Sequence, residues 1–151
     1  MKHLRNFIGL AAALLLISCD RDKPEDIGSP TWPDRLPKKL DFRAHVRPIL
    51  VINCIECHNE KDASKYNDLN LQTHKAAMTT GKNGPVIIPG NADGSLLIDM
   101  LGRDPTHQWA MPPTPDRIWG IRLEILKRWI NEGAKWPEGL VLEHPYDLKE
   151  W

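Results

Sequence analysis

The feature that most constrains this chain is a C-x-x-C-H motif formed by Cys54, Cys57 and His58. A polypeptide attaches haem covalently through this spacing, because one tight turn presents both sulfurs to one edge of the porphyrin. The two thiols add to the two vinyl groups as thioethers, and the neighbouring imidazole coordinates the iron. The motif therefore predicts one covalent haem c, held by Cys54 and Cys57, with His58 as an axial ligand.

Three other uses of these residues have to be weighed against haem. A thioredoxin-like dithiol needs a strand-to-helix context, and the sequence around the motif offers little strand signal. A zinc site usually needs four protein ligands. The remaining histidines are scattered along the chain, at His3, His45, His74, His107 and His144. A structural disulfide would make no use of His58, so haem attachment is the favoured interpretation.

Residues 1–18 have the pattern of a bacterial lipoprotein signal peptide. Lys2 and Arg5 precede an apolar run over residues 7–17, which is too short to span a bilayer comfortably. The run leads into Ser18 and Cys19 in a sequence that resembles a lipobox, which implies cleavage before Cys19 and lipidation of its thiol. Ordinary secretion with a free Cys19 and an uncleaved anchor are the alternatives.

All three cysteines then have a use, one for lipid and two for haem. Export fits this assignment, because bacteria attach c-type haem on the far side of the cytoplasmic membrane. The full chain has a formal net charge of +0, and losing Lys2 and Arg5 with the signal peptide leaves about −2. No basic patch indicates nucleic-acid binding. The expected partners are redox proteins and a membrane, with the haem domain in the periplasm of the cell envelope.

The mature chain divides into a tether, a folded domain and a tail. Residues 19–40 hold Cys19, a mixed-charge run and several prolines, a composition that predicts an irregular tether. Trp32 and Leu36 could instead pack back onto the domain. Residues 41–137 carry the helical patterns, and residues 138–151 form a tail with few apolar side chains.

The first helix is expected to start at the N-cap Asp41 and to carry an apolar stripe that Pro48 interrupts. A kink or restart is predicted at Pro48, since proline lacks an N–H and clashes with the preceding turn. Shorter helices are expected over residues 70–78 and from a cap among residues 91–93, through Ser95 and Met100, to an end near Gly102.

The last helix has the clearest pattern, with Thr114 as the expected N-cap and Gly133 as the expected stop. Its apolar face carries Ile118, Ile121, Ile125 and Trp129. The fold class is therefore a small all-α domain of about three to five helices around one covalent haem.

A low-spin electron carrier needs a second axial ligand on the other face of the iron. A methionine thioether is soft and favours ferrous iron, so it raises the reduction potential. Met111 precedes two prolines, which stiffen the segment and limit the entropy lost on coordination. Met111 is the predicted ligand, and an open site remains an alternative. The rival ligands are Met78, Met100, His74 and His107.

Over about residues 41–137 the sequence resembles the planctomycete-type cytochrome c domain. The resemblance rests on the C-x-x-C-H motif, Gly84-Pro85, Ser95–Ile98, Met111-Pro112-Pro113 and the apolar pattern of Leu126–Ala134. It departs from the family at Asn59, where a glycine is common, and over Thr114–Trp119, where a more acidic helix start is usual.

The resemblance implies a class I cytochrome c-like fold, with haem on Cys54 and Cys57, His58 proximal and Met111 distal. In class I cytochromes c, a proline carbonyl after a glycine often accepts the Nδ1–H of the proximal histidine. Pro85 is the expected acceptor here, and the bond would make His58 a more basic ligand.

These features predict a membrane-tethered protein that carries single electrons between periplasmic redox partners, and not an enzyme. A haem-based sensor or binding module is the alternative. A haem peroxidase is a weaker one: His107 could supply acid–base chemistry, but the sequence has no second haem motif to supply electrons.

Overall fold

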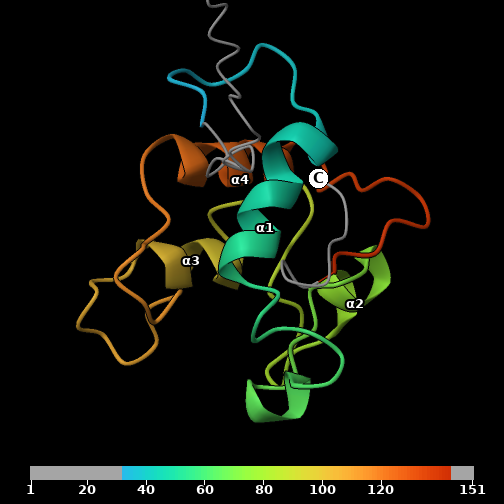
Figure 1. Ribbon diagram of the computed structural model, residues 1–151, viewed down its shortest axis with the longest axis vertical. Helices are drawn as coiled ribbons and strands as arrows, with labels where there is room; N and C mark the ends of the chain where they lie inside the picture. The colour runs from blue at the N-terminus through green and yellow to red at the C-terminus, as the bar shows by residue number, and fades with distance from the viewer. Residues whose placement is uncertain (1–31, 144–151) are drawn as a thin grey trace, which may run out of the picture.

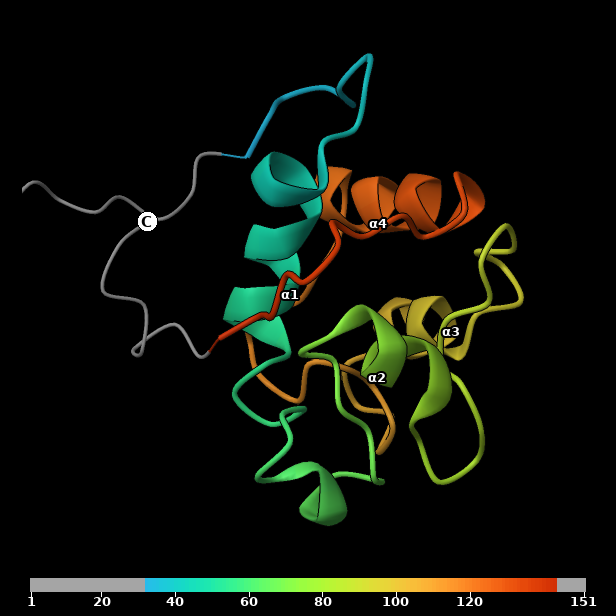
Figure 2. The same cartoon turned by 90° about the vertical axis from the view of Figure 1, so that its right-hand side faces the viewer.

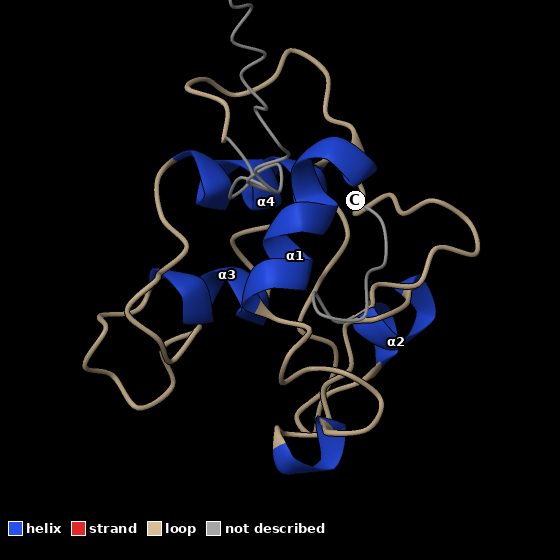
Figure 3. Cartoon of the chain, in the orientation of Figure 1, coloured by secondary structure: helices blue, strands red, loops and turns tan. Residues whose placement is uncertain are grey.

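The computed structural model describes residues 32–143, which form four short α-helices joined by long loops (Figure 1). The helices are α1 (Arg47–Asn53), α2 (His74–Thr79), α3 (Leu96–Gly102) and α4 (Ile121–Asn131), with a π-helical turn η1 (Phe42–Val46) and a 3-10 turn η2 (Ala63–Lys65). Figure 3 shows helices and loops and no strand in this part of the chain. The predicted all-α class is confirmed. Between residues 32 and 143, no helix is both long and apolar enough to cross a bilayer.

The helices are arranged so that α4 crosses one end of α1, while η2 and its flanking loops lie at the opposite end. Figures 1 and 2, two views at right angles, agree on this placement and show α3 beneath α4. The α4 helix contacts both η1 and α3. The segment that follows α1 therefore runs away from α4, toward the half of the domain that holds the long loops.

The first helical segment forms much as the sequence predicts. The Asp41 carboxylate caps it by accepting the N–H of Ala44 at 2.8 Å. The π-helical turn ends at Val46 and α1 starts at Arg47, which places Pro48 in the first turn of the new helix. A helix start tolerates proline because the N–H groups there have no partner inside the helix. The predicted restart at Pro48 is confirmed.

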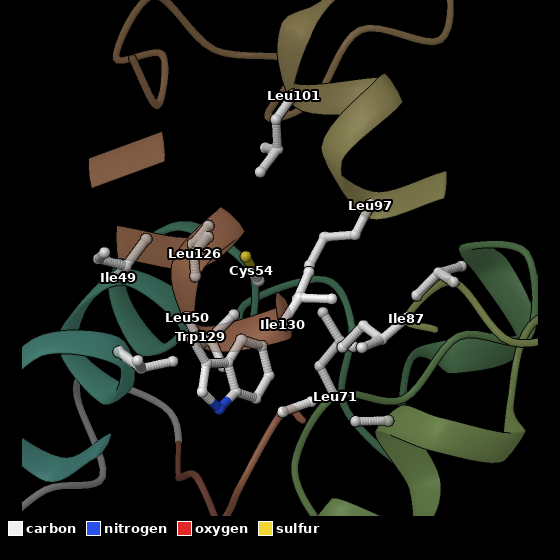
Figure 4. Close-up of a cluster of buried hydrophobic side chains, with 14 of the residues drawn as sticks. Ile49, Leu50, Cys54, Leu71, Ile87, Leu97, Leu101, Leu126, Trp129 and Ile130 are labelled. Atoms are coloured by element: carbon white, nitrogen blue, oxygen red, sulfur yellow. The ribbon is translucent and has the colours of Figure 1, made fainter. Parts of the chain in front are cut away.

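The core joins α1 to α4 through fully buried aliphatic side chains, among them Ile49 and Leu50 of α1 and Leu126 and Ile130 of α4 (Figure 4). Each such side chain contributes about 1.5–3 kcal/mol on burial. In Figure 4 the sulfur of Cys54 points into the middle of this cluster. The residue that ends α1 and begins the motif is therefore part of the core.

The two shorter helices differ from expectation in their starts. The α2 helix begins after Thr73, whose hydroxyl accepts the N–H of Ala76 at 3.1 Å, and not at residue 70. The α3 helix has Ser95 as its N-cap residue, and not one of the caps predicted at residues 91–93, whereas its end at Gly102 is as predicted.

The predicted start of the last helix is wrong: α4 begins at Ile121 and not after Thr114. Gly120 precedes it with φ 56° and ψ −131°, a conformation that only glycine adopts easily and that stops the helix from extending backwards. Ile118 is buried, but from a loop and not from the helix. The predicted stop is confirmed, because α4 ends at Asn131 and Gly133 has φ 95°.

The packed unit extends beyond the predicted limits of residues 41–137 on both sides. Arg128 of α4 donates to the carbonyl of Pro37 and, at 2.9 Å, to that of Lys38. The Arg122 guanidinium lies 5.6 Å from the ring centre of Trp32. Residues 32–40 are thus held on the domain, as the alternative for Trp32 anticipated. Cys19 and the rest of the expected tether lie outside the described residues.

At the other end, Leu142 is fully buried, although the expected tail starts at residue 138. Its N–H donates to the carbonyl of Gln72 at 2.7 Å, and the Gln72 amide donates to its carbonyl at 3.2 Å. The tail therefore contributes to the core as far as Leu142.

Candidate haem site

A cavity of about 320 Å³ lies between the segment after α1 and the region around α3. Cys54, Cys57, His58 and Met111 all line it. Most of the remaining wall is apolar and includes Leu69, Leu71, Val86, Leu97, Leu101 and Pro112. Its size and lining are those of a site for a small organic cofactor. The structure thus brings the four predicted haem residues to one cavity.

The motif forms a single tight turn directly after α1. The N–H groups of Cys57 and His58 both donate to the carbonyl of Cys54, at 3.2 Å and 2.8 Å. The Asn59 side chain donates to the carbonyl of Ile55 at 2.9 Å, so the residue that replaces the usual glycine fastens the turn. This turn directs both cysteines and the histidine toward the cavity.

The two thiols are free and differ in their surroundings. Cys54 is buried among aliphatic side chains, and Leu97 and Leu101 of α3 lie across from it in Figure 4. Burial, with a smaller contribution from neighbouring Cys57, raises the pKa of the Cys54 thiol to about 12. Cys57 is half-buried. Both residues line the cavity, and Cys54 is the more deeply buried of the two.

The imidazole of His58 is half-buried, and burial lowers its pKa, an effect that the nearby Leu69 carbonyl partly opposes. The neutral ring is the form that binds iron. Its Nδ1 atom is buried and has no hydrogen-bond partner among the described residues. The Nδ1 position of the ring is thus unpartnered.

The hydrogen bond predicted between His58 and the Pro85 carbonyl is not formed in this structure. His58 Nδ1 has no acceptor, and Pro85 is not among the residues that line the cavity. The carbonyl that influences the imidazole belongs to Leu69. The reason is the path of the chain, which brings the Leu69–Leu71 segment back to the motif, where the N–H of Leu71 donates to the His58 carbonyl at 2.9 Å.

Of the candidate second ligands, two line the cavity and three do not. Met111 lines it from the loop after α3, and Met100 lines it from α3 itself. Met78 packs against the core elsewhere, and the His74 ring lies 6.4 Å from that of Trp136. His107 is exposed, with its Nε2 atom 3.2 Å from the Arg103 guanidinium. Met100, which the helical pattern assigned to the core, therefore joins Met111 as a thioether at the site.

Sequence reasoning did not identify Tyr66 and Trp109, which line the cavity and remain about two-fifths exposed, at 43% and 42%. The Tyr66 ring meets the His58 ring edge-on, with 6.0 Å between ring centres. A hydrogen bond with Cys57 raises the pKa of the Tyr66 hydroxyl. Trp109 could have been found from its place two residues before Met111, whereas no sequence pattern marks Tyr66.

Residues 54–115 match a family model described as Planctomycete cytochrome C. The match runs from Cys54 past Met111, so it contains the whole candidate site, although it is shorter than the expected 41–137. No curated protein and no solved structure gives a match to this chain. The apolar cavity, the paired free thiols and the buried, unpartnered Nδ1 of His58 fit a covalently attached haem. The chain therefore contains a planctomycete-type cytochrome c domain, whose cofactor is covalently bound haem c.

Proposed function

We propose that this protein is a membrane-tethered c-type cytochrome that carries single electrons between redox proteins of the bacterial cell envelope. One observation supports this most strongly: the attachment motif and a methionine thioether line the same small apolar cavity. When bound, haem supplies an iron that changes its oxidation state by one electron. The protein's part is to hold that group rigidly and to control its surroundings.

Each residue of the site has a role in this proposal. The Cys54 and Cys57 thiols would hold the haem through thioether bonds, and the neutral His58 imidazole would coordinate its iron. Met111 would supply the second iron ligand, and its thioether would favour the ferrous state. The aliphatic wall that includes Leu97 and Leu101 excludes water, which also raises the reduction potential.

A carrier is favoured over a peroxidase because of where the histidines lie. A peroxidase needs an open distal site and an acid–base group within reach of it. His107 is exposed and paired with Arg103, and His58 is the only histidine among the described residues that line the cavity. If His58 and Met111 both coordinate the iron, nothing else would have to bind it.

The experiment that tests the proposal combines a redox titration with carbon monoxide. The purified protein is expected to give a single one-electron transition, and its ferrous form is expected to refuse carbon monoxide. Tight carbon monoxide binding would favour a sensor, and peroxide turnover would favour an enzyme. Either result would contradict the carrier.

A further inference from the structure

The side chain of Arg117 bridges three backbone oxygens beside the Met111 loop. Its Nη1 donates to the carbonyl of Pro112 at 3.0 Å. Its Nη2 donates to the carbonyls of Leu101 at 3.1 Å and Arg103 at 3.0 Å. Hydrogen bonds from a charged donor are stronger than those between neutral groups. One half-buried guanidinium therefore joins the loop to the end of α3.

The carbonyls that Arg117 binds belong to two segments, the end of α3 and the Met111 loop. Leu101 is in the last turn of α3 and Arg103 is its C-cap, and carbonyls at a helix end have no partner inside the helix. Pro112 is the residue directly after Met111. The guanidinium thus supplies hydrogen-bond donors to the carbonyls at the end of α3 and also fixes the Met111 loop to that helix end.

Met111 is fastened on its other side as well. Its N–H donates to the carbonyl of Met100 at 3.0 Å. The N–H of Met111 is bonded directly to α3. The carbonyl of the next residue, Pro112, is bonded to Arg117, which also binds the end of α3. Few backbone conformations therefore remain open to Met111. A ligand held in this way loses less conformational entropy when it binds.

Arg117 is itself fixed by α4. Its carbonyl accepts a hydrogen bond from Arg122 Nη2 at 2.6 Å, and its N–H donates to the carbonyl of Pro115 at 3.0 Å. Arg122 belongs to the first turn of α4, whose core-facing residues pack against α1. A continuous set of contacts therefore runs from α4 through Arg117 to the loop.

We infer that Arg117 is a positioning residue, which holds the Met111 thioether at the distal side of the cavity. The inference rests on the proposed role of Met111 as an axial ligand. Without the guanidinium, the loop gains conformations in which the thioether lies away from the iron, and exogenous ligands compete more easily. A residue that only capped α3 would lower the melting temperature when replaced, but would not change how well exogenous ligands compete for the iron.

The test compares Arg117→Leu and Arg117→Lys with Arg128→Leu in the haem-loaded protein. Arg128 is a matched control, because its guanidinium also binds two backbone carbonyls, those of Pro37 and Lys38, away from the cavity. The measurements are the melting temperature, the thioether-to-iron charge-transfer band, the carbon monoxide affinity of the ferrous form and hydrogen exchange at the Met111 amide.

Arg117→Leu is expected to weaken the band and to raise carbon monoxide affinity and Met111 amide exchange by about tenfold or more, which one lost charge-assisted hydrogen bond can produce. Arg117→Lys is expected to give values of all three measurements between those of the wild type and Arg117→Leu. It replaces Arg117→Leu in the comparison if that variant does not fold. Arg128→Leu should lower only the melting temperature. The inference is overturned if the Arg117 variants behave as Arg128→Leu does.

The proposed function can fail separately. If Met111→Ala keeps the band, Met111 is not the ligand, yet the Arg117 variants must still accelerate exchange at the Met111 amide. Normal exchange there would overturn the inference whatever the ligand proves to be.

Discussion

The N–H of Met111 donates to the carbonyl of Met100 at 3.0 Å, so the two methionines that line the cavity share one backbone contact. They differ in their setting. Met100 is within α3, where the helical backbone fixes its position, and Met111 is in a loop that Pro112 and Pro113 stiffen. The choice of distal ligand is thus between two thioethers, one presented by a helix and one by a constrained loop.

The difference between the two thiols predicts an order of chemical modification in the haem-free chain. Alkylation requires the thiolate, and burial holds the pKa of the Cys54 thiol at about 12. Half-buried Cys57 is expected to react with iodoacetamide at least about tenfold faster than Cys54 at pH 8. Peptide mass spectrometry measures both rates. In denaturant the two rates should converge, and equal rates in the folded chain would contradict the burial of Cys54.

The lowered pKa of His58 predicts a pH dependence of stability in the haem-free protein. Its pKa lies below the usual 6.5 in the folded state, so the unfolded state binds a proton more readily as the pH falls. The contribution of neutral His58 to the free energy of unfolding should therefore be fully present above pH 6.5. It should be lost as the pH falls through the lowered folded pKa. Urea titrations at pH 7.5 and pH 5.5 measure the change. His58→Gln should make this change in unfolding free energy smaller. An unchanged difference between the two pH values in that variant would show that His58 is not its source.

Burial of Leu142 predicts that the end of the packed unit is needed for stability. Leu142→Ala removes a fully buried side chain and should cost about 2–5 kcal/mol of unfolding free energy. The neighbouring Val141 is 48% exposed, so Val141→Ala should cost less than about 0.5 kcal/mol. Thermal denaturation of both variants makes the comparison. Equal losses would indicate that Leu142 is not part of the core.

The resemblance of residues 1–19 to a lipoprotein signal peptide with its lipobox predicts a lipid on Cys19. Mature protein from a bacterial host should begin at Cys19, carry the mass of a diacylglyceryl group and sediment with membranes. Cys19→Ala should lose both the lipid and the membrane association while retaining the haem spectrum. A wild-type protein that stays in the soluble fraction would leave the cytochrome domain intact but would exclude the tether.

The parts of the fold and site that could be predicted from the sequence depend on local patterns. The motif turn needs only residues 54–58, and the cap at Asp41 and the restart at Pro48 follow from the first helix alone. These contacts join residues a few positions apart, for which helix and turn preferences are informative.

The parts that could not be predicted depend on contacts between distant segments. The start of α4 was misplaced because Gly120 stops the helix, and because Arg117 is held in a loop by the carbonyls of Leu101 and Arg103 at the distant end of α3. The Pro85 acceptor was inferred from a resemblance, whereas the path of the chain brings Leu69 to His58. The contact between Gln72 and Leu142 likewise leaves no local signal.

The most direct test is the spectrum of the oxidised, haem-loaded protein with single methionine changes. Met111→Ala should abolish the thioether-to-iron charge-transfer band and allow the ferrous form to bind carbon monoxide. Met100→Ala, from the same cavity, should keep the band and still refuse carbon monoxide. Loss of the band in Met100→Ala with the band intact in Met111→Ala would contradict the His58–Met111 site.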